Sequence, residues 1–255
     1  MALTDHDTVD GLPEAVAAGE SLGVEIIPGV EISAQFPGGT MHILGLFVDY
    51  HNGLLDERLA VLKQARLDRN PQIISKLNAL GIPVTMGRVE EISGGGQVGR
   101  PHIARALMEL GAVSDLQEAF DKYLGWRKPG YVSKFRFPPE TAMTMIREAK
   151  GIPVLAHPFT LNQGSAYALR NLIVELKGQG LAGLEVIYSE HTREQEALYL
   201  KLARELDLLV TGGSDYHGLN KPEITLGSMP CQDRLTYDLV TALKAWRQRE
   251  YGLGG

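Results

Sequence analysis

The sequence predicts an α/β protein, and three observations support this prediction. Several segments follow one plan, in which an apolar or β-branched run ends near a polar residue and a helical pattern follows. Strand-like runs that alternate with helical segments of about 10–15 residues are typical of parallel βαβ units. The chain has 255 residues with 44% hydrophobic content, which is enough for a sizeable buried core.

The expected strands are short apolar runs, and most of them carry or precede a side chain that can bind a metal ion or a proton. They span 24–33, 41–48, 151–158, 183–188 and 208–217. The shortest run, Ala2-Leu3-Thr4, leads directly into Asp5-His6-Asp7.

Amphipathic helices are expected between these strands, over 12–22, 139–149, 166–178, 192–206 and 234–249. The segment 192–206, for example, places Leu198, Leu202 and Leu206 at the i, i+4 spacing of a buried stripe.

One stretch, 52–130, breaks the alternation because its pattern is helical throughout. We therefore expect a helical insertion over 52–130 in an α/β body formed by 1–51 and 131–255. Within the insertion, "SDLQEAFDKYLG" predicts a short helix with Ser114 as its N-cap.

Composition excludes several classes of protein. The net charge of −6 and the pI near 5.7 argue against a broad basic surface for duplex DNA, but allow a nucleotide or a short single strand. With Cys231 as the single cysteine, no intrachain disulfide can form, and a reducing cytoplasm is expected. No apolar run reaches the roughly 18 residues of a membrane span, and no secretory signal is visible. The oligomeric state does not follow from these features.

Six ligand-type side chains are expected to gather at one end of the sheet, because functional groups of parallel β/α folds lie beyond the carboxyl ends of the strands. Imidazoles and carboxylates together are typical ligands of divalent transition metals. A single histidine of this kind is more often structural, whereas the whole set favours metal binding. The set comprises His6, Glu31, His42, His157, Asp215 and His217.

Six motifs then occur in a familiar order: "LTDHDT", "GVEIS", "HILGLF", "GRPHIARAL", "LAHP" and "GGSDYHG". In this the chain resembles the PHP (polymerase and histidinol phosphatase) superfamily of metal-dependent phosphoesterases. It is most similar to the nucleoside 3′,5′-bisphosphate phosphatases and 5′-to-3′ exoribonucleases of the RNase AM type. The resemblance extends to about residue 230.

The resemblance implies a distorted (β/α)7 PHP barrel that holds up to three divalent ions, which could be Mn²⁺, Zn²⁺, Fe²⁺ or Mg²⁺. The nucleophile would be a metal-activated water, with no protein nucleophile. By motif position, Glu31 would bridge two ions and His42 and His157 would complete one of these sites. Asp215 would serve a second ion, and His6 with His217 a third.

Family members begin with a strand that carries His-x-His, followed by Ser-Asp-Gly and a helix, and the printed sequence starts after this unit. We therefore expect a chain that is N-terminally truncated by about one βα unit. The ligands Glu31, His42 and His157 would then suffice for one ion.

Four further residues are candidates for contact with the substrate. Arg100 and His102 stand at the start of a predicted helix, where an arginine and the helix N-terminus can bind phosphate, although a solvated Arg100 is the alternative. Lys134 in "YVSKFRF" and His191 in "SEHT" would add polar groups near the site.

The sequence thus predicts a metal-dependent phosphoesterase that acts on a nucleotide or on short single-stranded RNA. One alternative is a histidinol-phosphatase-like phosphomonoesterase, which shares the metal motifs but would not need the GRPHIA segment. The other is a metal-poor remnant that binds a nucleotide without turnover.

Overall fold

The computed structural model describes residues 1–218, 224–226 and 234–253. It divides into two units, of which one comprises residues 1–59 and 136–255 and the other residues 60–135. Cys231 lies outside the described residues. None of the described helices has both the length and the apolar character needed to cross a membrane.

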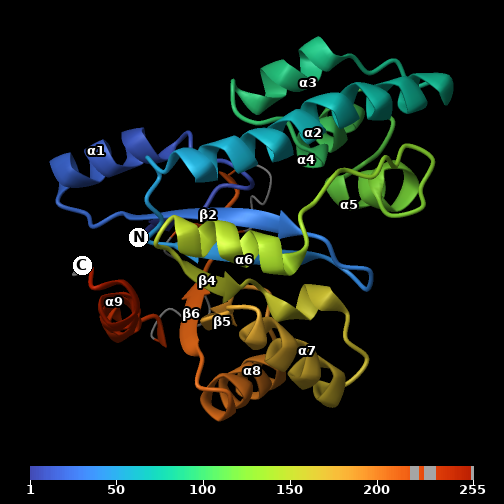
Figure 1. Cartoon of the computed structure of the whole chain (residues 1–255). Coiled ribbons are helices and arrows are strands. Elements are labelled where there is room, and N and C mark those ends of the chain that lie inside the picture. The colour runs from blue at the N-terminus through green and yellow to red at the C-terminus, as the bar shows by residue number, and fades with distance from the viewer. Residues whose placement is uncertain (219–223, 227–233, 254–255) are drawn as a thin grey trace. The chain divides into compact units, whose positions relative to one another are not determined.

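The first unit is built on a curled, half-barrel sheet, whose described strands pair in chain order from β1 to β6 (Figure 1). The strands are β1 (Ala2–Leu3), β2 (Ile27–Ala34), β3 (Met41–Leu46), β4 (Ile152–Leu155), β5 (Gly183–Tyr188) and β6 (Leu209–Gly213). The positions of the expected strands are therefore confirmed, while the seven-stranded barrel stays a prediction.

Strand direction differs in part from the expected parallel arrangement. Three pairs of strands are parallel: β1 with β2, β4 with β5, and β5 with β6. In each of these pairs a helix connects the two strands along the chain. The expectation was wrong for β3, which is antiparallel to both β2 and β4. Residues 35–40 alone join β2 to β3, and a parallel crossover needs about a dozen residues or more.

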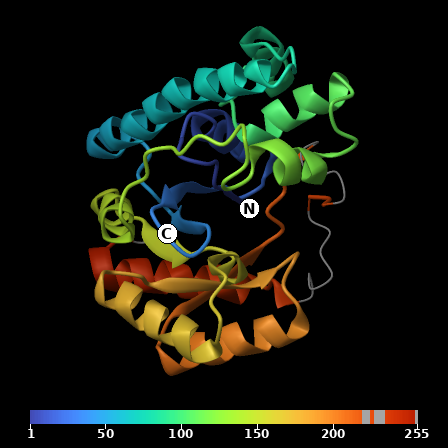
Figure 2. The same cartoon turned by 90° about the vertical axis from the view of Figure 1, so that its right-hand side faces the viewer.

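The helices of the first unit lie close to their predicted ranges. They are α1 (Leu12–Leu22), α6 (Pro139–Glu148), α7 (Ala166–Gly178), α8 (Arg193–Glu205) and α9 (Tyr237–Tyr251), with a 3₁₀ turn, η2, at Pro158–Leu161. α7 and α8 lie side by side in both views (Figures 1 and 2). Leu243 of α9 is buried in one core cluster with residues of β2, β3 and β4.

The second unit is helical among its described residues. α2 (Gly53–Ala79) begins in the first unit, and α3 (Met86–Ser93), α4 (Arg100–Glu109), α5 (Leu116–Ala119) and the π-helix η1 (Phe120–Leu124) follow. Its own core includes Ile73, Leu77 and Leu107. The predicted N-cap Ser114 was wrong by one residue: Asp115 caps α5, because its carboxylate accepts the Glu118 N–H at 2.7 Å.

Candidate metal centre

The loop after β1 lies beside β2 and brings His6 next to Glu31. The Glu31 N–H donates to the Asp5 carbonyl at 3.0 Å, and the Asp7 N–H donates to the Glu31 carbonyl at 2.9 Å. Asp7 has a left-handed backbone with φ 56°. Its fully buried carboxylate accepts hydrogen bonds from the Ser33 N–H at 2.8 Å and the Ser33 hydroxyl at 3.2 Å. The loop is thereby fastened to β2 on both sides of His6.

Strands β3 and β4 add two more imidazoles. Because β3 is antiparallel to β2, its amino end lies at the carboxyl end of β2, and His42 pairs with Ser33. The Ala156 N–H donates to the His42 carbonyl at 3.1 Å, so that His157, the next residue, follows β4 beside His42. His157 also has a positive φ, of 25°.

These side chains converge on the Glu31 carboxylate. Glu31 Oε1 lies 2.6 Å from His42 Nδ1 and 3.1 Å from His157 Nε2, and Glu31 Oε2 lies 3.4 Å from His6 Nδ1. The His6 and His42 ring centroids are 4.8 Å apart. One ligand atom from each of His6, Glu31 and His42 lies within 4.8 Å of the others, a spacing that a single ion could draw together.

The electrostatics of this cluster keep the buried carboxylate of Glu31 ionised. Burial by itself would raise the pKa of Glu31, but the charges of His6 and His42 and the hydrogen bonds from His157 and His42 outweigh it and hold that pKa well below its usual range. Burial likewise opposes the charged form of His157, yet the hydrogen bond and charge of Glu31 raise its pKa. An ionised carboxylate among imidazoles is a donor set that fits a divalent transition metal.

Asp215 and His217 lie beside this cluster, just after β6. The His217 Nδ1–H donates to the Asp215 carbonyl at 2.8 Å. In this tautomer Nε2 carries the lone pair that could bind a metal. The His217 and His6 ring centroids are 5.7 Å apart. All six predicted ligand-type residues therefore belong to one neighbourhood, and their division among separate ions stays a prediction. The structure groups His6 with Glu31 as well as with His217.

Sequence reasoning missed two residues of β5. Glu185 is buried, its Oε2 accepts the His157 N–H at 2.8 Å, and burial raises its pKa to about 7 although His157 opposes the shift. Tyr188 donates its hydroxyl proton toward Asp215 Oδ2 at 2.9 Å. An acidic residue within the apolar run "GLEVIY" was the available signal for Glu185, whereas Tyr188 resembles any core aromatic residue.

Two of the predicted substrate contacts stand, as expected, at the start of α4. Arg100 Nη1 donates to the Leu124 carbonyl at 3.0 Å, and its guanidinium lies 5.5 Å from the centroid of the Phe120 ring. His102 Nδ1 accepts the Gly99 N–H at 3.0 Å and so caps the helix. Burial and the charges of neighbouring arginines lower the pKa of His102, which suits a neutral acceptor.

Of the other two predicted contacts, His191 lies in the first unit and Lys134 in the second. The His191 Nδ1–H donates to the Val186 carbonyl at 2.9 Å, and the His191 ring packs 4.9 Å from each of the Tyr188 and Tyr199 rings. Lys134 is half-buried in the segment before α6. Substrate contact by these residues stays a prediction.

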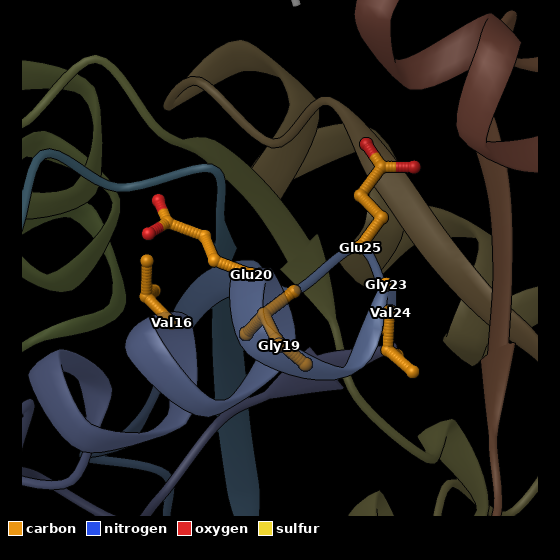
Figure 3. Close-up of a pocket in the computed structure, with 7 residues that line it drawn as sticks. Val16, Gly19, Glu20, Gly23, Val24 and Glu25 are labelled. Carbon is orange, nitrogen blue, oxygen red and sulfur yellow. The ribbon is translucent and has the colours of Figure 1, made fainter.

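A separate hollow of about 360 Å³ lies between the end of α1 and the start of β2 (Figure 3). It lies at the amino end of β2, whereas the metal-ligand candidates lie in the carboxyl half of β2, at the amino end of β3, and after the carboxyl ends of β1, β4 and β6. Its charged lining residues are Glu20 and Glu25, and Glu25 is paired with Lys244 at 2.7 Å. The hollow therefore lacks the donor set found around Glu31.

Comparison with known proteins agrees with this geometry, although no protein-family model matches the chain. A 5′-3′ exoribonuclease from Haemophilus influenzae is 36% identical over 217 residues, which are 85% of this chain and 78% of that protein. A 3′,5′-nucleoside bisphosphate phosphatase from Chromobacterium violaceum is 35% identical over 218 residues, 85% of this chain and 76% of the relative.

A solved structure from Bifidobacterium adolescentis, described as a metal-dependent phosphoesterase, matches with a TM-score of 0.84 and 30% identity. The match covers 96% of this chain and 84% of that structure. Fold and site thus define the class of metal-dependent phosphoesterases. Within it, the chain belongs to the PHP-type family that includes the 5′-3′ exoribonucleases and the 3′,5′-nucleoside bisphosphate phosphatases.

Proposed function

We propose that this protein is a metal-dependent phosphoesterase that hydrolyses nucleoside 3′,5′-bisphosphates or releases nucleotides from the 5′ end of short RNA. The convergence of three imidazoles on the buried carboxylate of Glu31 is the observation that carries the proposal. The names of the two relatives indicate the substrate class.

The residues around Glu31 would hold the ion, and Asp215 with His217 would extend the site toward a second one. When bound, a divalent ion supplies Lewis-acid stabilisation of phosphoryl oxygens and lowers the pKa of water. The chain itself contributes fixed imidazole tautomers. His217 Nδ1–H is directed to a backbone carbonyl, and His157 Nδ1 lies 3.1 Å from the Thr160 hydroxyl. The other nitrogen of His217, Nε2, would then serve as the ligand, and in His157 an ion would replace the proton between Nε2 and Glu31 Oε1, which are 3.1 Å apart.

For the substrate, we infer that Arg100 supplies the main phosphate contact from the helical insertion 52–130. His102, Lys134 and His191 are the further candidates. The Arg100 guanidinium is a planar fork of N–H donors whose geometry matches phosphate, and its Nη1 also donates to the Leu124 carbonyl.

The test is hydrolysis by chelator-treated protein to which Mn²⁺ is returned. The substrates are adenosine 3′,5′-bisphosphate and a short 5′-phosphorylated RNA, and chromatography separates the products. We expect Mn²⁺-dependent turnover, and Glu31→Gln should lower it at least about a hundredfold, which corresponds to about 2.7 kcal/mol of barrier. His51→Gln, which changes an exposed loop histidine, is the matched control and should retain activity.

The outcomes separate the alternatives. Turnover of histidinol phosphate without turnover of the bisphosphate or the RNA would indicate the histidinol-phosphatase type. Binding of Mn²⁺ and nucleotide without any hydrolysis would indicate the binding remnant. Turnover that Glu31→Gln leaves unchanged would refute the proposed site.

A further inference from the structure

Strand β5 lies between β4 and β6 in the sheet. Two of its side chains contact residues just beyond the carboxyl ends of these neighbouring strands. Glu185 accepts the backbone N–H of His157 after β4, and Tyr188 donates its hydroxyl proton toward Asp215 after β6. Both contacted residues have a positive φ, 25° for His157 and 52° for Asp215. Such backbone is strained in a residue other than glycine and persists only where surrounding contacts hold it.

A β-bulge allows both β5 side chains to reach the site. Residues three apart on a regular strand point to opposite faces, so Glu185 and Tyr188 should diverge. The register shows otherwise, because Glu185 pairs with Thr211 while Ile187 pairs with the next residue of β6. Val186 is therefore an extra residue, and this restores Tyr188 to the face of Glu185.

Two contacts hold the bulge in place. The Val186 carbonyl accepts the His191 Nδ1–H at 2.9 Å, which gives the bulged residue a side-chain partner. On β6, Gly212 lies so close to β5 that a Cβ there would come 2.4 Å from the Ile187 carbonyl oxygen. This close approach requires a residue without a side chain.

The bulge brings the Tyr188 hydroxyl to a defined place beside Asp215. Tyr188 is 2% exposed, and its ring packs 5.5 Å from the His157 ring and 5.8 Å from the Phe159 ring, so its orientation is fixed. The hydroxyl lies 2.9 Å from Asp215 Oδ2, and the opposite oxygen, Oδ1, lies 3.3 Å from His217 Nδ1. Glu190 Oε2, at 2.7 Å, is a second acceptor for the same single proton.

We propose that Tyr188 is a positioning residue, which the bulge at Val186 directs onto Asp215 Oδ2 so that Oδ1 is presented to a divalent cation. The proposal rests on the proposed metal-dependent function. It adds that the metal-binding rotamer of Asp215, which follows β6, depends on a side chain of the neighbouring strand β5.

The test compares Tyr188→Phe with Tyr199→Phe in Mn²⁺ titrations that measure free Mn²⁺ by electron paramagnetic resonance. Both changes remove one hydroxyl from a tyrosine that packs on His191, but within the described part of the chain the hydrogen bond from a tyrosine hydroxyl to Asp215 comes from Tyr188. We expect Tyr188→Phe to weaken the Asp215-dependent Mn²⁺ site about tenfold, as loss of a hydrogen bond to a metal ligand commonly does. Tyr199→Phe should match the wild type.

A double-mutant cycle keeps the proposal falsifiable if Tyr188→Phe also lowers stability. In an Asp215→Asn background, Tyr188→Phe should cause no further loss of Mn²⁺ affinity. Equal effects of Tyr188→Phe in both backgrounds, or unchanged affinity in the single variant, would overturn the proposal.

Kinetics provide a second measurement. The kcat of Tyr188→Phe should fall at low Mn²⁺ and recover when Mn²⁺ is in excess, while the KM for adenosine 3′,5′-bisphosphate stays the same. A kcat defect that excess Mn²⁺ does not reverse would contradict metal positioning. Because the Mn²⁺ titration needs no substrate, it remains decisive even if the proposed substrates are not hydrolysed.

Discussion

Removal of the Asp7 side chain should destabilise the first unit and release His6. In Asp7→Ala, the buried Ser33 N–H loses its acceptor, and an alanine must adopt the left-handed backbone of Asp7. An unsatisfied buried N–H costs about 1–3 kcal/mol, and the left-handed conformation adds about 1 kcal/mol for a residue other than Gly, Asn or Asp. We therefore expect a loss of about 2–4 kcal/mol in the free energy of unfolding.

Asp7→Asn is the matched control for this prediction. Asparagine tolerates a positive φ, its carbonyl oxygen can accept the Ser33 N–H, and its amide can donate to the Ser33 hydroxyl. The free energy of unfolding of this variant should lie within about 1 kcal/mol of the wild type, because the main change is the loss of charge assistance in the hydrogen bond to Ser33.

Urea denaturation followed by tryptophan fluorescence can measure the effect within the correct unit. The chain has two tryptophans, of which Trp246 lies in α9 of the first unit and Trp126 in the second. In a Trp126→Phe background, fluorescence therefore reports the unit that contains Asp7. If Asp7→Ala and Asp7→Asn both unfold within about 0.5 kcal/mol of the parent protein, the range of ordinary surface changes, the reasoning is refuted.

Two further predictions concern helix α4. The pKa of folded His102 lies below its usual 6.5, so its cap on Gly99 is fully present above that pH and is lost as the pH falls through the folded value. Acidification should therefore lower the free energy of unfolding of the wild type by about 1 kcal/mol through loss of this cap, and His102→Gln should lack this loss. Urea unfolding at several pH values measures the effect, and equal pH profiles for the wild type and the variant would contradict it. Arg100→Ala should weaken binding of adenosine 3′,5′-bisphosphate about tenfold without changing Mn²⁺ affinity, and should cost about 1 kcal/mol of stability through the lost Leu124 bond. Unchanged nucleotide affinity in calorimetry would contradict the proposed phosphate contact of Arg100.

Local sequence patterns were sufficient to locate most elements of the fold. The segments 12–22 and 166–178 coincide with α1 and α7, because the spacing of apolar residues along a helix reports directly which face is buried. The candidate ligands could also be recognised, since a polar group at the end of an apolar strand is conspicuous. The predicted N-cap of α5 was wrong by one residue because Ser114 and Asp115 are both residue types that cap helices well. Only the backbone geometry distinguishes them.

The sequence by itself determined which residues could bind a metal and roughly which segments are strands and helices. The tertiary structure decided how these residues meet. The antiparallel pairing of β3 brings His42 to Glu31, Asp7 is fastened to Ser33, and the bulge at Val186 turns Tyr188 toward Asp215. The physical reason is that periodicity records only whether a side chain is buried. Strand direction, register and bulges depend on hydrogen bonds to partners that are distant in the chain.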